Sequence, residues 1–87
     1  MGKYTKLLTS ILSGSSDKNI AFEDLCRLLL RLGFDQRIKG DHFIFSRVGV
    51  NEIINLQPLG NMTKPYQVKQ VRQIILNYKL GSLDADE

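Results

Sequence analysis

The sequence predicts an α+β domain, on three observations. Apolar residues recur at helical spacing in two early segments and in one late segment. Between them lie three short runs that are rich in β-branched and aromatic residues. The 87 residues are enough for one domain, and 43% hydrophobic with 24% charged residues is typical of a soluble globular one. The expected architecture packs helices on one face of a three-stranded antiparallel sheet, in the order α-α-β-β-β-α.

The first two helices are predicted from their apolar stripes. Over residues 3–13, apolar side chains recur at i, i+3, i+4, i+7 and i+8 from Tyr4. Over residues 22–32, acidic residues at the start and arginines near the end suit the helix dipole. Ala21 is a weak N-cap for this second helix, and Gly33 is placed to end it.

Three short β-forming segments follow. Their predicted bounds are residues 34–39, 42–47 and 52–57. Alternation in the first segment places Arg37 and Lys39 on the same face. A Gly40-Asp41 step links the first two segments, and such residues are favoured in tight hairpin turns.

A loop with proline and glycine signals precedes the last helix. Pro65 fits the first turn of this helix, where its missing N–H has no intrahelical partner to lose, and Gly81 is placed to end it. The predicted buried stripe consists of Val68, Val71, Ile74, Ile75 and Tyr78. Within one domain, residues 1–20 are expected to form a helical extension, residues 21–80 a core, and residues 81–87 a flexible acidic tail.

The charge balance favours an anionic partner. The chain has 12 lysines and arginines against 9 acidic residues, and three of those acids lie in the tail. Nucleic acid and an acidic protein both fit this excess. The alternative is that the charge serves solubility alone.

A single cysteine excludes an internal disulfide. Cys26 lies among leucines, so we predict a buried thiol instead of a reactive one. No apolar run approaches the ~20 residues that span a bilayer, and the first residues lack the apolar core of a signal peptide. We therefore expect a cytoplasmic protein.

His42 is the strongest candidate for chemistry. It is the one histidine, and imidazole exchanges protons near neutral pH. Arg37 and Lys39 lie just upstream, where they can hold a phosphate and stabilise its developing charge. Gly40 permits close approach by a ligand, and Asp41 either orients the imidazole or only forms the turn. The alternative is an ordinary strand histidine that is satisfied by a backbone carbonyl.

RNA cleavage is the enzyme class that fits one imidazole. The ribose 2′-OH is a built-in nucleophile, so a single general acid/base suffices and no metal or other cofactor is expected. The acidic residues are scattered instead of gathered into a metal-binding cluster. The chain also lacks a P-loop, a nucleophile-elbow serine, a Cys/His pair and a dinucleotide-binding glycine motif.

A second basic group lies at the last helix. Lys64, Lys69 and Arg72 are at or beyond its N-terminus, where backbone N–H groups favour anions. This group is a candidate phosphate platform for an RNA duplex, and the alternative is a solvated helix face. Tyr66 is the tyrosine left for base stacking, because the other two fall on apolar stripes.

These residues resemble the HicA toxin family, the small bacterial and archaeal mRNA interferases of type II toxin–antitoxin modules. The resemblance covers about residues 22–80. The matching motifs, in chain order, are Leu32-Gly33-Phe34, Lys39-Gly40-Asp41-His42-Phe43-Ile44-Phe45, Lys64-Pro65 and Val71-Arg72-Gln73-Ile74-Ile75.

The resemblance implies a double-stranded-RNA-binding-like α-β-β-β-α fold, here with an extra N-terminal helix. It implies ribosome-independent mRNA cleavage by the motif histidine, which is His42. It also implies a HicB-type antitoxin that covers this histidine, and we predict one antitoxin chain for each toxin chain.

Two residues depart from the family pattern. Asp41 stands where serine or threonine is usual, and Phe43 stands where a second histidine is common. A carboxylate beside the site repels phosphate, and without a second imidazole the general acid is either Lys39 or a water. The competing expectation is therefore a weakly active or inactive RNA-binding or protein-binding module on the same fold.

Overall fold

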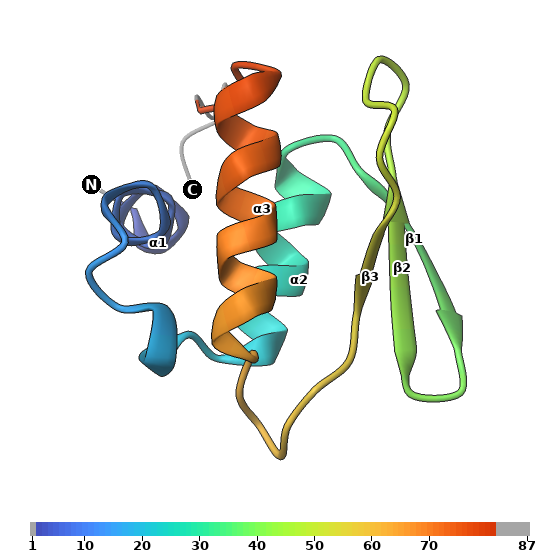
Figure 1. Cartoon of the computed structure of the whole chain (residues 1–87), viewed down its shortest axis with the longest axis horizontal. Helices are drawn as coiled ribbons and strands as arrows, with labels where there is room; N and C mark the ends of the chain where they lie inside the picture. The colour runs from blue at the N-terminus through green and yellow to red at the C-terminus, as the bar shows by residue number, and fades with distance from the viewer. Residues whose placement is uncertain (1, 82–87) are drawn as a thin grey trace.

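The computed structural model describes residues 2–81 (Figure 1). Its elements are α1 (Lys3–Ser13), a 3₁₀ turn η1 (Asp17–Asn19), α2 (Phe22–Arg31), β1 (Asp35–Lys39), β2 (His42–Ser46), β3 (Ile54–Leu56) and α3 (Pro65–Asn77). The α+β class and the predicted order of helices and strands are confirmed. Residues 82–87 of the predicted acidic tail lie outside the described residues.

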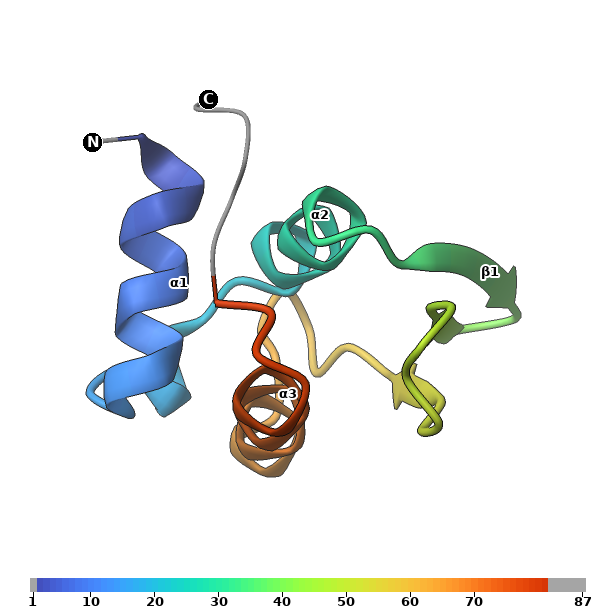
Figure 2. The ribbon, with the colours of Figure 1, turned by 90° about the horizontal axis from the view of Figure 1, so that it is seen from above.

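The elements form three layers (Figures 1 and 2). The sheet is one layer, and α2 and α3 together cover one of its faces. The helix α1 packs against α2 and α3 on the side away from the sheet. The expectation that the helices pack on one face of the sheet thus holds for α2 and α3, whereas α1 forms an outer layer. None of the described elements covers the second face of the sheet (Figures 1 and 2).

The first two helices follow the predicted stripes. The α1 helix has the predicted bounds, and α2 ends at Arg31, one residue earlier than predicted. Gly33 has φ +94°, and the N–H of Phe34 donates to the carbonyl of Leu29. This is a Schellman motif, which uses a left-handed residue to satisfy the last carbonyls of a helix. Ala21 is the N-cap and makes no side-chain capping bond, as predicted.

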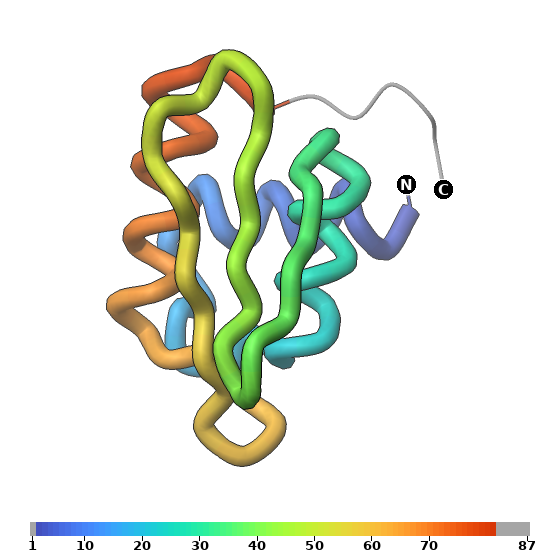
Figure 3. Tube along the Cα trace, turned by 90° about the vertical axis from the view of Figure 1, so that its right-hand side faces the viewer, coloured from blue at the N-terminus to red at the C-terminus, as the bar shows by residue number. Residues whose placement is uncertain are grey.

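The sheet is antiparallel with the order β1-β2-β3 (Figure 3). Lys39 pairs with His42 across the two-residue Gly40-Asp41 turn. Gly40 has φ +62°, and Asp41 is not among the residues with positive φ, which is the pattern of a type II′ turn. The observed strands are shorter than predicted, because Phe34, Arg47 and the ends of the third segment lie outside them.

One face of the sheet enters the core. Phe45, Ile54 and Leu56 are fully buried, and the Phe43 ring meets Phe22 of α2 edge-on at 5.0 Å between centroids. Buried side chains of this size each contribute about 2 kcal/mol to folding. Cys26 is buried within the same cluster, which confirms the prediction for this residue.

The last helix begins as predicted and ends earlier. Pro65 occupies the first turn, but α3 ends at Asn77. Lys79 adopts φ +56°, and the N–H of Leu80 donates to the Ile75 carbonyl at 2.9 Å. The prediction that Gly81 ends the helix is therefore wrong, because Lys79 takes the left-handed position despite its side chain. Among the described helices, none combines the length and the apolar character needed to cross a bilayer.

Candidate active site

The strand register brings three predicted residues to one face of the sheet. His42 pairs with Lys39, and Arg37 pairs with Ile44, two residues after His42. Directly paired residues point to the same side of a sheet, as do residues two apart. Arg37, Lys39 and His42 therefore share the open face, while Phe43 and Phe45 point into the core. The side chain of His42 is 48% exposed.

Asn55 of β3 holds the imidazole ring of His42. The Nδ1 atom of His42 lies 3.1 Å from the Oδ1 atom of Asn55. An amide oxygen only accepts, so this bond places the ring proton on Nδ1 and leaves the lone pair of the neutral ring on Nε2. The Nε2 atom is thus the proton acceptor of the site.

Asp41 is fixed beside the ring as an anion. Its Oδ2 atom accepts a hydrogen bond from the Gln57 side-chain amide at 2.6 Å, and its Oδ1 atom lies 3.7 Å from Nε2 of His42. The bond from Gln57, with smaller contributions from His42 and Lys64, lowers the pKa of Asp41 below its ordinary value. Asp41 therefore stays ionised at neutral pH, and it both links the turn to the Gln57 side chain and places negative charge at the site.

Gly40 leaves the space over the turn open. A Cβ atom at this position would meet no atom within 4 Å, and the positive φ disfavours any residue with a side chain. Close approach by a ligand is therefore possible here, and the turn itself is sufficient reason for glycine.

Lys64 lies at the junction of the last loop and α3. Its N–H donates to Oε1 of Gln67 at 3.3 Å, and its charge is close enough to Asp41 to lower the pKa of that carboxyl. Lys64 is therefore at the same end of the molecule as the hairpin turn.

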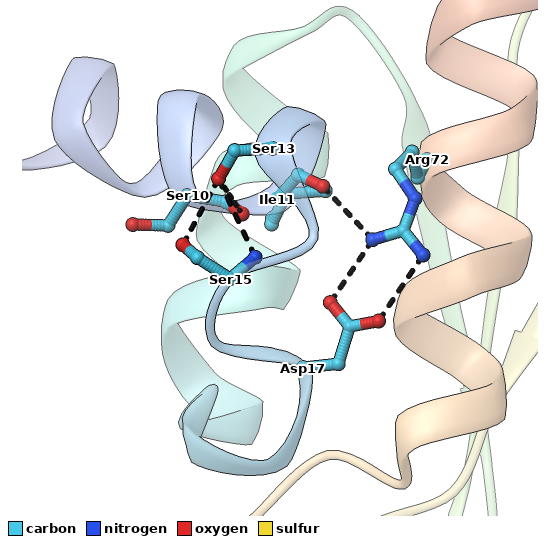
Figure 4. A network of polar contacts seen from close by, with 6 residues as sticks. All are labelled: Ser10, Ile11, Ser13, Ser15, Asp17 and Arg72. Atoms are coloured by element: carbon cyan, nitrogen blue, oxygen red, sulfur yellow. Dashed lines mark hydrogen bonds and ion pairs between the residues drawn. The ribbon is translucent and has the colours of Figure 1, made fainter.

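Arg72 has a structural role in the described chain (Figure 4). Its guanidinium donates two hydrogen bonds to the Asp17 carboxylate, at 3.0 and 3.1 Å, and a third to the Ile11 carbonyl at 3.0 Å. The arginine and aspartate side chains are only 16% and 14% exposed. This pair ties α3 to α1 and η1 and occupies the guanidinium, so the contacts give no support to the expectation that Arg72 joins the phosphate platform, which stays a prediction.

Lys69 is exposed on α3. It precedes Arg72 by three residues, so the two share a flank of the helix. That flank faces α1 and η1 instead of the sheet. The structure thus brings Lys64 toward His42 but leaves Lys69 and Arg72 on another side of the molecule.

The tyrosines divide as the apolar stripes indicate. Tyr4 is buried, and Tyr78 is half-buried with its hydroxyl donating to a Glu52 carboxylate oxygen at 2.6 Å. Tyr66 remains exposed at 63%, at the start of α3.

Two site residues, Asn55 and Gln57, are absent from the sequence prediction. They lie 13 and 16 residues from their partners in the hairpin, and only the pairing of β2 with β3 brings them close. A signal was present, because Asn55 and Gln57 alternate in the sequence with Ile54 and Leu56, the two residues that β3 buries.

The arrangement combines a proton acceptor with cations on an open surface. The Nε2 atom of His42 can take a proton from a hydroxyl, and Arg37 and Lys39 can offset charge that develops on a phosphate. The Asp41 carboxylate works against phosphate binding at the same place. Comparison of the chain with known protein families, with curated proteins and with solved structures finds no match.

Proposed function

We propose that this chain is the toxin of a toxin–antitoxin module, a metal-independent endoribonuclease that cleaves mRNA with His42 as general acid/base. One observation carries the proposal. The oriented, half-exposed imidazole of His42 lies on an open sheet face that it shares with Arg37 and Lys39. The motifs that resemble the HicA family give the same assignment.

The chemistry needs one imidazole and a ribose. Nε2 of His42 takes the proton of the 2′-OH, and the resulting oxygen attacks the adjacent phosphorus. The bond from phosphorus to the 5′-oxygen breaks, which leaves a 2′,3′-cyclic phosphate and a 5′-hydroxyl. Arg37 and Lys39 stabilise the negative charge on the phosphate oxygens, and Lys39 or a water gives the 5′-oxygen its proton.

An inhibitory partner belongs to this proposal. A HicB-type antitoxin would cover His42, as the family resemblance implies. An exposed face with cations is suited to an acidic protein, because complementary charge speeds association and selects the partner.

A second function is favoured by Asp41. Its carboxylate lies 3.7 Å from Nε2 of His42 and is ionised at neutral pH. A phosphate at Nε2 would meet this charge at close range. The alternative is therefore an RNA-binding or protein-binding module with little or no turnover.

The test is cleavage of a dye- and quencher-labelled RNA by the purified chain in excess EDTA. We expect the RNA to be cleaved. The same oligonucleotide made with 2′-deoxyribose should stay intact, because it lacks the 2′-OH nucleophile. His42→Ala should lower the rate by a factor of about 100 or more. Lys18→Ala, at an exposed position in η1, is the matched control and should cleave like the wild type.

Two results would contradict the proposal that this chain is a nuclease that uses His42. RNA that binds but stays intact would support the binding module. Cleavage that persists in His42→Ala would remove His42 from the reaction.

A further inference from the structure

The strand β1 is an edge of the sheet that no other segment of residues 2–81 covers (Figure 3). It pairs with β2 on one side, and all five of its residues are exposed. Gln36 and Ile38 point toward the helix side of the sheet, because they pair with Phe45 and Phe43, yet Ile38 is 57% exposed. Figure 2 shows β1 extending beyond the helices. In the part of the chain that the structure describes, the inner side of this strand therefore has no cover.

The backbone of β1 presents free hydrogen-bonding groups at this edge. Lys39 and His42 close a two-residue turn, so they form a hydrogen-bonded pair, and bonded pairs alternate along an antiparallel ladder. The N–H and C=O groups of Gln36 and Ile38 therefore point away from β2. Within residues 2–81, neither residue has a hydrogen bond from outside the hairpin.

An apolar groove lies beside this edge, between α2 and the sheet. Its volume is about 320 Å³, and its walls include Phe22, Cys26, Leu30, Gln36 and Phe43. A strand added to β1 would direct every second side chain into the groove, because side chains alternate across a strand. The remaining side chains would lie beside Arg37 and Lys39 on the open face.

We propose that the β1 edge and this groove are a docking site for an extended segment of a partner protein that alternates apolar and acidic residues. The main chain of the segment would bond to Gln36 and Ile38, as in other cases of strand addition to a sheet edge. Its apolar residues would fill the groove, and its acidic residues would face Arg37 and Lys39. The proposal does not depend on RNA cleavage.

Charge on the open face of β1 favours an acidic partner, because Arg37 and Lys39 outnumber Asp35 there. Two β1 strands paired antiparallel about Arg37 would place Arg37 directly opposite its own copy, where like charges destabilise a sheet, and would place each Asp35 opposite a Lys39. The cationic edge itself hinders self-pairing, as charged edges do in many proteins. An acidic strand removes this repulsion.

The experiment uses the full-length ¹⁵N-labelled chain and a capped seven-residue peptide that alternates glutamate and valine. At about 1 mM peptide we expect the Gln36 and Ile38 amides to exchange with solvent at least about tenfold more slowly than in the free chain. Two control peptides are used, one with the same residues in block order and one with lysine in place of glutamate. Each should change the exchange rates of these amides by less than about threefold.

Two variants separate the backbone from the side chains. Gln36→Pro removes an outward N–H at an edge, where proline is tolerated, and should abolish protection of Ile38. Gln36→Ala keeps the N–H and should retain protection. Arg37→Glu leaves the backbone intact and should reverse the preference, so that the basic peptide protects the amides more than the acidic peptide does. This variant keeps the test decisive even if the proline variant unfolds.

Three results would overturn the proposal. The first is no protection by the alternating peptide, and the second is equal protection by the block peptide. The third is protection that rises with protein concentration in the absence of peptide, which would identify a second copy as the occupant. RNA cleavage is not measured, so failure here leaves the nuclease proposal standing.

Discussion

His42 and Asn55 meet across the open face of the sheet, with Nδ1 of the ring 3.1 Å from Oδ1 of the amide. Neither residue is buried, so the contact adds little to the stability of the fold. Its consequence is chemical, because it sets which ring nitrogen has the lone pair and where that nitrogen points.

Asn55 is therefore expected to act as a positioning residue. Asn55→Ala should lower RNA cleavage about tenfold, mainly in kcat, because the ring loses its preferred tautomer and orientation. Asn55→Asp keeps an acceptor and adds a charge that favours the imidazolium, so its rate optimum should move to higher pH. Unfolding midpoints should match the wild type. An unchanged pH–rate profile in Asn55→Asp would contradict this role.

Asp41 should weaken RNA binding at every pH near neutrality. Asp41→Asn removes the charge and keeps a turn-forming shape, so RNA affinity should rise about fivefold as the repulsion of the phosphate is lost. The pKa of Asp41 is lowered from its ordinary 3.8, so the carboxyl is ionised throughout pH 5–8 and the difference should be constant there. It should vanish only in stronger acid. Fluorescence anisotropy at pH 7 measures the RNA affinities of the wild type and Asp41→Asn. Equal affinities would show that the carboxylate does not meet the phosphate.

The ion pair between Arg72 and Asp17 should matter for folding and not for RNA. Arg72→Ala leaves the largely buried carboxylate unpaired and should lower the free energy of unfolding by about 2–3 kcal/mol. The neighbouring Lys69→Ala should change it by less than ~0.5 kcal/mol. Urea unfolding measures both values. Weaker RNA binding by a folded Arg72→Ala protein of unchanged stability would return Arg72 to the phosphate platform.

Cys26 should make the fold sensitive to alkali. Burial raises the pKa of its thiol from 9.0 to about 11, so above pH 9 the unfolded chain loses a proton that the folded chain keeps. The free energy of unfolding should fall by up to ~1.4 kcal/mol per pH unit between these values and level off above them. In Cys26→Ala this part of the slope should be missing, as urea unfolding at several pH values would show. Identical slopes in both proteins would mean that the thiol is not the titrating group.

The sequence predicts helices better than it predicts the site. The apolar stripes of α1 and α2 are local signals, and they place three of the four ends of these helices correctly. Lys79 shows the limit of such signals, because glycine at position 81 is the better residue for a left-handed cap while tertiary packing places the cap two residues earlier.

Long-range contacts could not be predicted. His42 is identifiable from its place after a tight turn, but Asn55 becomes its partner only through the register of β2 and β3, which one strand's residues do not specify. Arg72 is a second residue whose long-range partner the local sequence does not reveal. Its position near the start of a helix suggests a phosphate contact, whereas Asp17, 55 residues earlier, takes its guanidinium.

The most direct test of the central claim is induced expression in a bacterial host, with growth and transcript integrity followed for the wild type and for His42→Ala. The proposal predicts growth arrest and loss of mRNA with the wild type, and neither with a folded His42→Ala protein at equal abundance. Normal growth with intact transcripts in wild-type cells would contradict it and would leave the binding module as the function of this fold.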